Sequence, residues 1–311
     1  MSPSEKQAVS PTPKPLDKYA FEALRTRASS GYTIRFGQLQ EETSDYSVYP
    51  FTFTSDGKKV SGLAHIPNGI GPYPVIVQYR GFVSGDIYEP GVGTKHSAEV
   101  LAKNRFISLA PDFLGFGTSD KAVNDAMESR FQNYTTAIDL LNALPTLNNA
   151  LKRIGKTQAD AVHVGIWGHS NGGHIALVVL ELTGKRYPTV LWAPVSKPFP
   201  YSLFYYMNRS SDGGKILRKI IADFEQYYDS DHYSLTNYIE WIHGPIELHQ
   251  GTDDGSVPEW WSSDFVDLLK KHNKTVTYFT YPGENHNFSK GSWNLVMRRT
   301  VDFYTAAFNA K

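Results

Sequence analysis

The sequence predicts an α/β fold in which a mostly parallel, doubly wound sheet is flanked by helices and carries a small helical, aromatic-rich insertion. Three observations support this prediction. Short β-rich runs alternate with helix-like stretches over most of the chain. Several of these runs are apolar almost throughout, as expected of strands buried on both faces of a parallel sheet. One connection is about fifty residues long, where a few residues or a single helix would suffice.

The first residues, 1–16, have the composition of a disordered leader. Pro, Ser and Thr are frequent there, and apolar periodicity is absent. The segment holds no apolar h-region, so it is not itself a signal peptide. It matches either an ordinary frayed terminus or the tether left after removal of a signal segment, which would make the protein secreted or surface-tethered. Residues 17–311 are expected to form one domain, beginning with a short helix over Leu16–Arg27.

A hairpin is expected before the main sheet. Residues 46–54 and 59–66 alternate apolar and polar side chains and are separated by the turn Ser55-Asp56-Gly57. This pattern is typical of two antiparallel strands joined by a tight turn. We expect the pair to form one end of the sheet.

The remaining strands and helices alternate. Strands are expected at Pro74–Tyr79, Arg105–Ala110, Ala161–Trp167, Pro188–Trp192, Pro245–His249 and Thr275–Tyr281. Helices are expected at His96–Lys103, Glu128–Ile154 (interrupted near Pro145), Gly172–Leu182, Trp260–His272 and Asn294–Phe308. Strand, helix and strand in succession imply right-handed βαβ units and a doubly wound sheet.

The long connection, at about residues 195–243, is rich in Tyr, Phe and Trp. We interpret it as a helical cap over the carboxyl edge of the sheet and attribute most of its aromatic side chains to packing. Ligands bind at this edge in open α/β sheets, so part of the cap is expected to line a pocket. Tyr205 is our candidate for a substrate contact.

Composition excludes several classes of function. The 31 basic and 31 acidic residues cancel, which leaves no electrostatic footprint for nucleic acid or anionic lipid. The absence of cysteine excludes disulfides, thiolate catalysis and cysteine-rich metal sites. No apolar run approaches the roughly 20 residues that span a bilayer, so we expect a soluble chain.

The strongest local signal is Gly168–Gly173, which reads GHSNGG between a predicted strand and a predicted helix. This is the G-x-S-x-G nucleophile elbow in its proper strand–turn–helix context. A tight, strained turn would lift the Ser170 hydroxyl above the sheet, and the flanking glycines would let strand and helix approach closely. The helix N-terminus favours developing negative charge. The sequence therefore predicts Ser170 as a nucleophile.

A serine hydroxyl needs an adjacent base, and His286 is the best candidate. It stands in the turn-rich loop Tyr281–Phe288, after the last apolar strand and before the final helix. That position places it at the same sheet edge as the elbow. The other histidines are attributed to packing or solvation; His169 and His174 flank the serine without the reach to serve it.

The acid should lie on a loop between the nucleophile and the histidine, because the chain order in this type of fold is Ser, acid, His. The loop Gly251–Pro258 satisfies this order and holds Asp253 and Asp254. One should accept the imidazole N–H, while the other points elsewhere, for example to cap the next helix. Spacing alone does not choose between them.

Donors for a tetrahedral oxyanion are also required. The backbone N–H of Asn171, which follows the nucleophile, should be one. The second should come from the loop after an early strand, here Tyr79–Phe82.

These motifs together resemble the catalytic domain of the prolyl oligopeptidase family and its esterase relatives, over about residues 45–310. The family's G-x-S-x-G-G, G-x-x-D-x-x-V-P and Y-P-x-E-x-H motifs read here GHSNGG, GTDDGSVP and YPGENH. The resemblance implies an α/β-hydrolase fold with Ser170, Asp254 and His286 as the catalytic residues. Asp254 is chosen over Asp253 by counting back from Val257-Pro258.

The resemblance leaves two candidates for the second oxyanion donor. The family's oxyanion tyrosine stands in a Y-x-G pattern that matches Tyr79–Gly81, which implies its hydroxyl. In the related esterases the backbone N–H after the glycine serves instead, which here belongs to Phe82. Phe82 and Asn171 should also rim the substrate pocket. The segment 111–120 resembles the family's D-x-x-G-x-G-x-S loop, with Leu114 where Arg is common, and is interpreted as a structural turn.

One departure from the family bears on activity. Family peptidases usually carry a large N-terminal β-propeller, whereas about 45 residues precede the resemblance here and cannot form one. This favours a carboxylic-ester hydrolase that acts through an acyl-enzyme on Ser170. An exo- or oligopeptidase using the same residues is the alternative, and a non-catalytic binding protein a third. No metal or cofactor is expected, and the expected partner is a small ester or short peptide substrate. The sequence leaves open the oligomeric state, the compartment, and the specificity for the acyl and alcohol parts of the substrate.

Overall fold

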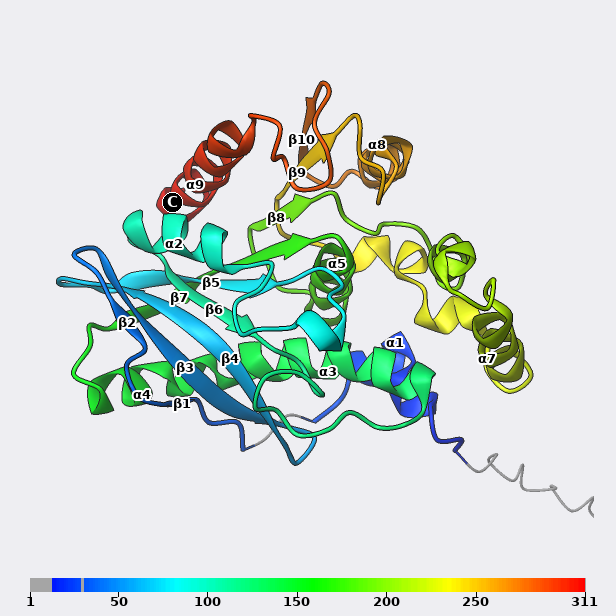
Figure 1. The fold of residues 1–311 in the computed structure, drawn as a ribbon, viewed down its shortest axis with the longest axis horizontal. Helices are drawn as coiled ribbons and strands as arrows, with labels where there is room; N and C mark the ends of the chain where they lie inside the picture. Colours follow the sequence, from blue (N-terminus) through cyan, green and yellow to red (C-terminus); the bar gives the residue numbers. More distant parts are fainter. Residues whose placement is uncertain (1–12, 29–30, 311) are drawn as a thin grey trace, which may run out of the picture.

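A single ten-stranded sheet organises the chain. In the computed structural model, which describes residues 13–28 and 31–310, the strand order is β1-β3-β4-β6-β5-β7-β8-β9-β10, with β2 paired to β3 (Figure 1). The expected mostly parallel sheet is therefore present, with an antiparallel portion at one end.

The antiparallel end is built on the predicted hairpin. Strands β3 (Tyr46–Ser55) and β4 (Lys58–Pro67) pair along their whole length. Asp56 and Gly57 join them with φ of 47° and 75°, which suits the two left-handed positions of a tight hairpin turn. Two-residue strands β1 (Arg35–Phe36) and β2 (Glu41–Glu42) extend this end; they are too short to show an alternation in the sequence.

The parallel part holds the predicted buried strands. It consists of β5 (Tyr73–Tyr79), β6 (Ile107–Pro111), β7 (Ala159–His169), β8 (Thr189–Trp192), β9 (Ile246–Gly251) and β10 (Val276–Tyr281). Strand β4 meets β6 antiparallel, and all later pairs are parallel. Parallel strands bring their carboxyl ends to one edge, and this edge carries the motif residues.

Helices cover both faces of the sheet. Helices α2 (Lys95–Lys103) and α9 (Trp293–Asn309) pack together on one face, as Figure 1 shows. The other face carries α3 (Ala126–Ala143), α4 (Leu147–Arg153), α5 (Asn171–Thr183) and α8 (Glu259–Lys271). The expected break near Pro145 is a short 3-10 turn, Leu144–Thr146, between α3 and α4. Within the described residues, no helix is long and apolar enough to cross a bilayer.

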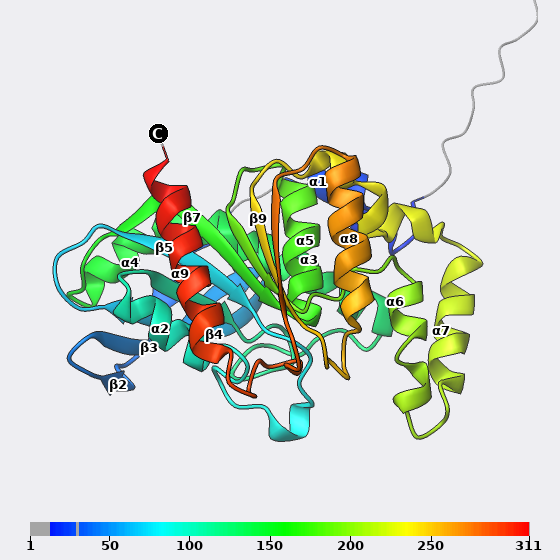
Figure 2. The ribbon, with the colours of Figure 1, turned by 90° about the horizontal axis from the view of Figure 1, so that it is seen from above.

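The cap lies between β8 and β9 and is helical. It contains α6 (Tyr201–Phe204), α7 (Lys215–Glu225) and several 3-10 turns, and Figure 2 shows α7 at the outer end, beyond α6. Its aromatic side chains Phe199, Phe224 and Tyr233 pack around Phe131 of α3, with ring centroids 5.0 to 5.9 Å away. Aromatic packing thus anchors the cap on the domain.

The end of the expected leader is ordered, which corrects its boundary at residue 16. Leu16 is buried; its N–H donates to Tyr228 Oη, and its carbonyl accepts from Tyr233 Oη, at 3.2 and 3.1 Å. Apolar burial against the cap explains this order. Residues 1–12 lie outside the described residues. The expected short helix appears as a 3-10 turn (Asp17–Tyr19) followed by α1 (Phe21–Arg25).

Candidate active site

Ser170 occupies a strained turn between β7 and α5. Its φ and ψ are 57° and −121°, a conformation that costs a non-glycine residue about 1–3 kcal/mol. Hydrogen bonds hold the turn: the Ser170 N–H donates to the Trp192 carbonyl at 2.9 Å, and the Ser170 carbonyl accepts from the Val195 N–H at 3.0 Å. The fold therefore enforces the strain expected of a nucleophile elbow.

Two glycines of the elbow are required by close packing. A Cβ on Gly172 would overlap the Tyr79 carbonyl oxygen, and a Cβ on Gly168 would come within 2.5 Å of the Gly172 carbonyl oxygen. Strand β5 can approach the first turn of α5 only because Gly172 lacks a side chain, and β7 can do so only because Gly168 lacks one.

The loop after β5 lies against the serine. A Cβ on Gly81 would be 3.0 Å from Ser170 Cβ and 3.6 Å from Ser170 Oγ. The backbone that follows β5 therefore borders the space in front of the hydroxyl, where an oxyanion donor is needed.

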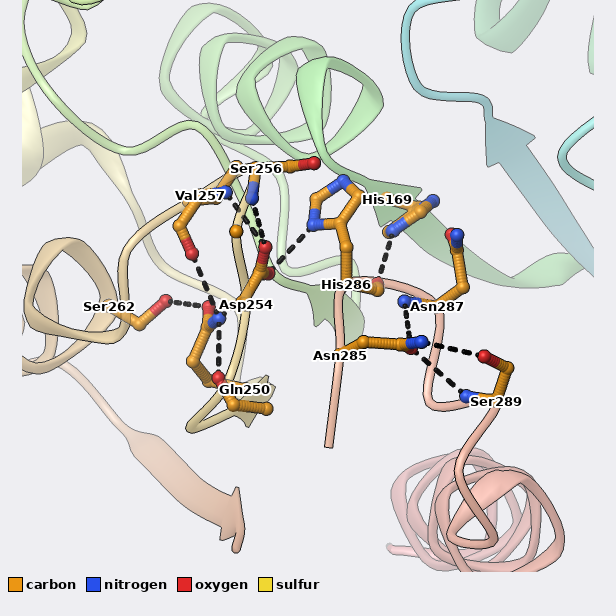
Figure 3. A network of polar contacts seen from close by, with 12 residues as sticks. His169, Gln250, Asp254, Ser256, Val257, Ser262, Asn285, His286, Asn287 and Ser289 are labelled. Carbon is orange, nitrogen blue, oxygen red and sulfur yellow. Dashed lines mark hydrogen bonds and ion pairs between the residues drawn. The ribbon is translucent and has the colours of Figure 1, made fainter. Parts of the chain in front are cut away.

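Asp254 and His286 form a hydrogen-bonded pair at this edge (Figure 3). Nδ1 of His286 donates to Oδ2 of Asp254 at 2.7 Å, and the carboxylate is completely buried. Oδ1 accepts from the N–H groups of Ser256 and Val257 at 2.8 and 2.9 Å. Burial alone would raise the pKa of Asp254, but these hydrogen bonds outweigh it and hold the pKa below its usual value. The carboxylate is thus fixed in its charged form.

Asp253 points away from this pair. Its carboxylate is exposed and lies 3.4 Å from Lys290 Nζ. It does not cap the next helix, because α8 begins after Pro258 without a side-chain cap. The expectation of a helix cap is therefore wrong: the carboxylate turns outward into solvent.

His169 links the elbow to the histidine loop. Its ring centroid lies 4.5 Å from that of His286, and its Nε2 donates to the His286 carbonyl at 3.0 Å (Figure 3). A carbonyl only accepts, so Nε2 carries the hydrogen. Burial lowers the pKa of His169 to about 3, so the ring is neutral. Sequence reasoning saw only a flanking residue, whereas the structure makes it a support for the backbone at residue 286.

No hydrogen bond joins Ser170 Oγ to His286 within the described part of the chain. Both residues nevertheless neighbour His169. Ser170 follows it in the chain, and the His286 ring packs against the His169 ring. Hydrogen bonds between a nucleophile and its base are often long without substrate and tighten when it binds.

Glu284 organises the loop that carries His286. Its two carboxylate oxygens accept from the backbone N–H groups of Lys290 and Ser292 at 2.9 and 2.5 Å. Burial would raise the pKa of Glu284, but the backbone hydrogen bonds lower it below its usual value. Sequence reasoning gave this residue no role, although the glutamate of the Y-P-x-E-x-H motif was a visible signal.

The Tyr79 hydroxyl does not face the site, which corrects one of the two oxyanion candidates. Tyr79 is fully buried, and its Oη donates to the Ala137 carbonyl of α3 at 3.1 Å. Burial raises its pKa well above the usual value. The side chain shares a face of β5 with Val75 and Val77 and packs into the core with them, because side chains alternate along a strand.

The backbone donors remain available. Within the described residues, neither the Asn171 N–H nor the Phe82 N–H is hydrogen-bonded in the protein. The Phe82 side chain is 82% exposed. Two free N–H groups, one next to Ser170 in the chain and one next to Gly81, which lies against Ser170, fit an oxyanion site.

Arg80 fixes the peptide that carries one of these donors. Its guanidinium is buried, lies 4.2 Å from the Phe116 ring centroid, and donates to the carbonyls of Gly81 and Asp112 at 3.0 Å each. In a trans peptide the C=O and N–H point in opposite directions. By holding the Gly81 carbonyl, Arg80 directs the Phe82 N–H away from itself. Sequence reasoning did not identify this role.

The cap reaches the acid loop near Tyr205. Tyr206 Oη donates to the Ser256 carbonyl at 3.1 Å. Tyr205 is 37% exposed, and its ring meets that of Trp261 edge to face at 4.7 Å. Tyr205 therefore lies at the border between the cap and the acid loop. Within the described part of the chain, no cluster of His, Asp and Glu could hold a metal ion.

The family model described as "Prolyl oligopeptidase family" matches residues 93–311. The chain belongs to this family. Its serine hydrolase character and α/β-hydrolase fold follow, and Ser170, Asp254 and His286 all lie inside the matched residues.

Individual relatives include peptidases and an esterase. A probable dipeptidyl peptidase 4 of Aspergillus flavus is 24% identical over 246 residues, 75% of this chain and 30% of the relative. Acetyl xylan esterase 1 from Thermoanaerobacterium superposes with a TM-score of 0.63 at 17% identity, covering 95% of this chain and 96% of the esterase. Porphyromonas gingivalis dipeptidyl peptidase 4 gives 0.61 at 17% identity, covering 85% and 36%. The chain spans about a third of these peptidases and nearly all of the esterase.

Proposed function

We propose that this protein hydrolyses carboxylic esters through an acyl-enzyme formed on Ser170. The observation that carries the proposal is the buried Asp254–His286 hydrogen bond at the sheet edge where the strained turn presents Ser170. A serine beside an oriented imidazole is the arrangement that activates a hydroxyl as nucleophile.

The reaction would proceed by two acyl transfers. Ser170 Oγ attacks the ester carbonyl while Nε2 of His286 takes its proton, and Asp254 stabilises the imidazolium. The oxyanion accepts from the N–H groups of Asn171 and Phe82. His286 then gives the proton to the leaving alkoxide. Water, deprotonated by His286, attacks the acyl-enzyme, and the proton passes from His286 to Ser170 Oγ as the acid leaves.

We favour ester hydrolysis over peptide hydrolysis because of the chemistry of the leaving group. The fold itself fits either reaction, since the chain superposes on acetyl xylan esterase 1 and on dipeptidyl peptidase 4 with TM-scores of 0.63 and 0.61. An alkoxide is a better leaving group than an amine, so an ester requires less proton transfer from His286. The peptidase alternative rests on sequence, because the Aspergillus flavus relative aligns over 75% of the chain.

The test compares matched substrates and one variant. We expect p-nitrophenyl acetate and butyrate to be hydrolysed by the wild type and not above background by Ser170→Ala. A fluorophosphonate probe should label Ser170. Equal rates with wild type and variant would refute the proposal, and failure of labelling would indicate a non-catalytic binding protein. Turnover of aminoacyl-naphthylamides without turnover of the matched esters would establish the peptidase instead.

A further inference from the structure

A cavity of about 690 Å³ lies beside the elbow, on the face of the sheet covered by α2 and α9. Its walls are formed by residues that neighbour the predicted catalytic residues in the chain. One wall is the segment 89–97, which follows the loop after β5; another is His169, next to Ser170; a third is Asn287 and Ser289, next to His286. The volume is that of a typical small-molecule site.

We propose that this cavity binds the leaving-group alcohol of the ester and selects alcohols that carry an aromatic ring. The proposal rests on the proposed ester hydrolysis. Since His286 must protonate the leaving oxygen, the leaving group has to lie on the side of the histidine loop. Asn287 and Ser289 of that loop line the cavity, whereas Tyr205 and the cap stand on the side of the acid loop.

Aromatic rings form a continuous wall along the cavity. From the elbow outward, successive ring centroids are 6.2 Å apart for His169 and Trp167, 5.1 Å for Trp167 and Trp192, 5.2 Å for Trp192 and Trp293, and 6.5 Å for Trp293 and His96. Trp167 and Trp192 are buried, Trp293 is half-buried, and His96 is exposed. Aromatic rings attract one another at these centroid distances. The aromatic ring of a substrate alcohol could therefore pack against this wall in the same way.

The hydroxyl groups that line the cavity favour an aromatic alcohol over a sugar. The hydroxyls of Thr94 and Ser97 already donate their hydrogens within the protein, and that of Ser289 accepts from Asn285. The side-chain amide of Asn287 has no hydrogen bond within the described residues. Other polar partners for a sugar, the side chains of Glu89, Lys95 and Asn287, are exposed at the rim. Deeper in the cavity a sugar would lose hydration without replacement, whereas an aromatic ring gives up little hydration.

The first experiment compares two esters with the same acyl group. We expect Trp293→Ala to lower kcat/KM for 2-naphthyl acetate by about three- to tenfold, the worth of an aromatic contact, and to leave ethyl acetate within about twofold. Trp293→Phe keeps a ring and should retain most of the activity on 2-naphthyl acetate. Trp260→Ala is the control: this indole of α8 is 45% exposed and outside the cavity, so both esters should react as with wild type. Equal losses on both esters, or no loss, would overturn the proposal.

The second experiment measures binding without catalysis. In the Ser170→Ala background, 2-naphthol should bind, and Trp293→Ala should weaken its Kd by a similar factor in calorimetric titration. Ester hydrolysis by the wild type without binding that depends on Trp293 would refute the assignment of the cavity and leave the proposed function standing. Binding that depends on Trp293, in a wild type that hydrolyses no ester, would refute the proposed function and with it the leaving-group role.

Discussion

Replacing Asp254 by Asn tests the geometry of the site directly. All four groups that contact the carboxylate are donors: His286 Nδ1 and Gln250 Nε2 reach Oδ2 at 2.7 and 3.0 Å, and the N–H groups of Ser256 and Val257 reach Oδ1. An amide offers only one accepting atom. If the amide oxygen keeps the two backbone donors, its NH₂ group faces His286 and donates to Nδ1. The hydrogen of the imidazole then moves to Nε2, which can no longer take a proton from the serine.

The expected loss is large. An imidazole held in the wrong tautomer lowers kcat by about 10⁴, equivalent to about 5.5 kcal/mol of barrier. The amide also faces buried donors that it cannot satisfy, which should destabilise the fold by about 1–3 kcal/mol. The assays are kcat on p-nitrophenyl acetate and urea unfolding. The matched control is Asp253→Asn, which changes an exposed carboxylate and should leave kcat within about twofold.

Two results would contradict this reasoning. A folded Asp254→Asn protein with kcat within about tenfold of wild type would show that the carboxylate does not set the tautomer of His286. A comparable loss in Asp253→Asn would show that the neighbouring carboxylate acts instead.

Three further changes probe the surroundings of the site. Tyr79→Phe should leave kcat unchanged and cost about 0.5–1.5 kcal/mol of stability, because the hydroxyl bonds the Ala137 carbonyl in the core; a kcat loss of hundredfold at unchanged stability would reinstate the hydroxyl as oxyanion donor. Phe82→Pro removes a backbone N–H and should lower kcat by about 10²–10³, whereas Phe82→Ala keeps the N–H and should not; equal losses would point to the ring. Glu284 has a lowered pKa in the folded protein. Its ionised carboxylate therefore contributes fully to the free energy of unfolding at pH values above the usual glutamate pKa. This contribution is lost as pH falls through the lower pKa of the folded state. The Tm gap between wild type and Glu284→Gln should therefore be constant near neutrality and shrink below about pH 4.3; a gap that widens in acid would contradict this.

The fold could be predicted because its signals are local. Each strand of the parallel sheet is a short apolar run, and the elbow around Ser170 is a contiguous motif between a strand and a helix. Of the two oxyanion candidates that the sequence left open, the structure excludes the Tyr79 hydroxyl by its place on β5. Alternation along β5 places Tyr79 on the face of Val75 and Val77, and this face packs against α3, where the hydroxyl meets the Ala137 carbonyl.

The supporting contacts could not be predicted, since they join segments far apart in the sequence. Arg80 and Asp112 meet across the carboxyl edge of the sheet, and His169 meets the backbone of His286. No spacing within one segment encodes such pairs. The choice between two adjacent aspartates was of the same kind: a motif of related proteins favoured one, and only folded geometry distinguishes a buried carboxylate from an exposed one.

The contact of Leu16 with the cap gives the cap a second attachment to the domain. The cap grows out of the sheet between β8 and β9, yet Tyr228 and Tyr233 are also fastened to the start of the chain by two hydrogen bonds and a buried leucine. A movement of the cap away from the domain would have to break these two hydrogen bonds and expose the leucine to water. The position of the cap is therefore coupled to a segment that lies more than 150 residues from Ser170 along the chain.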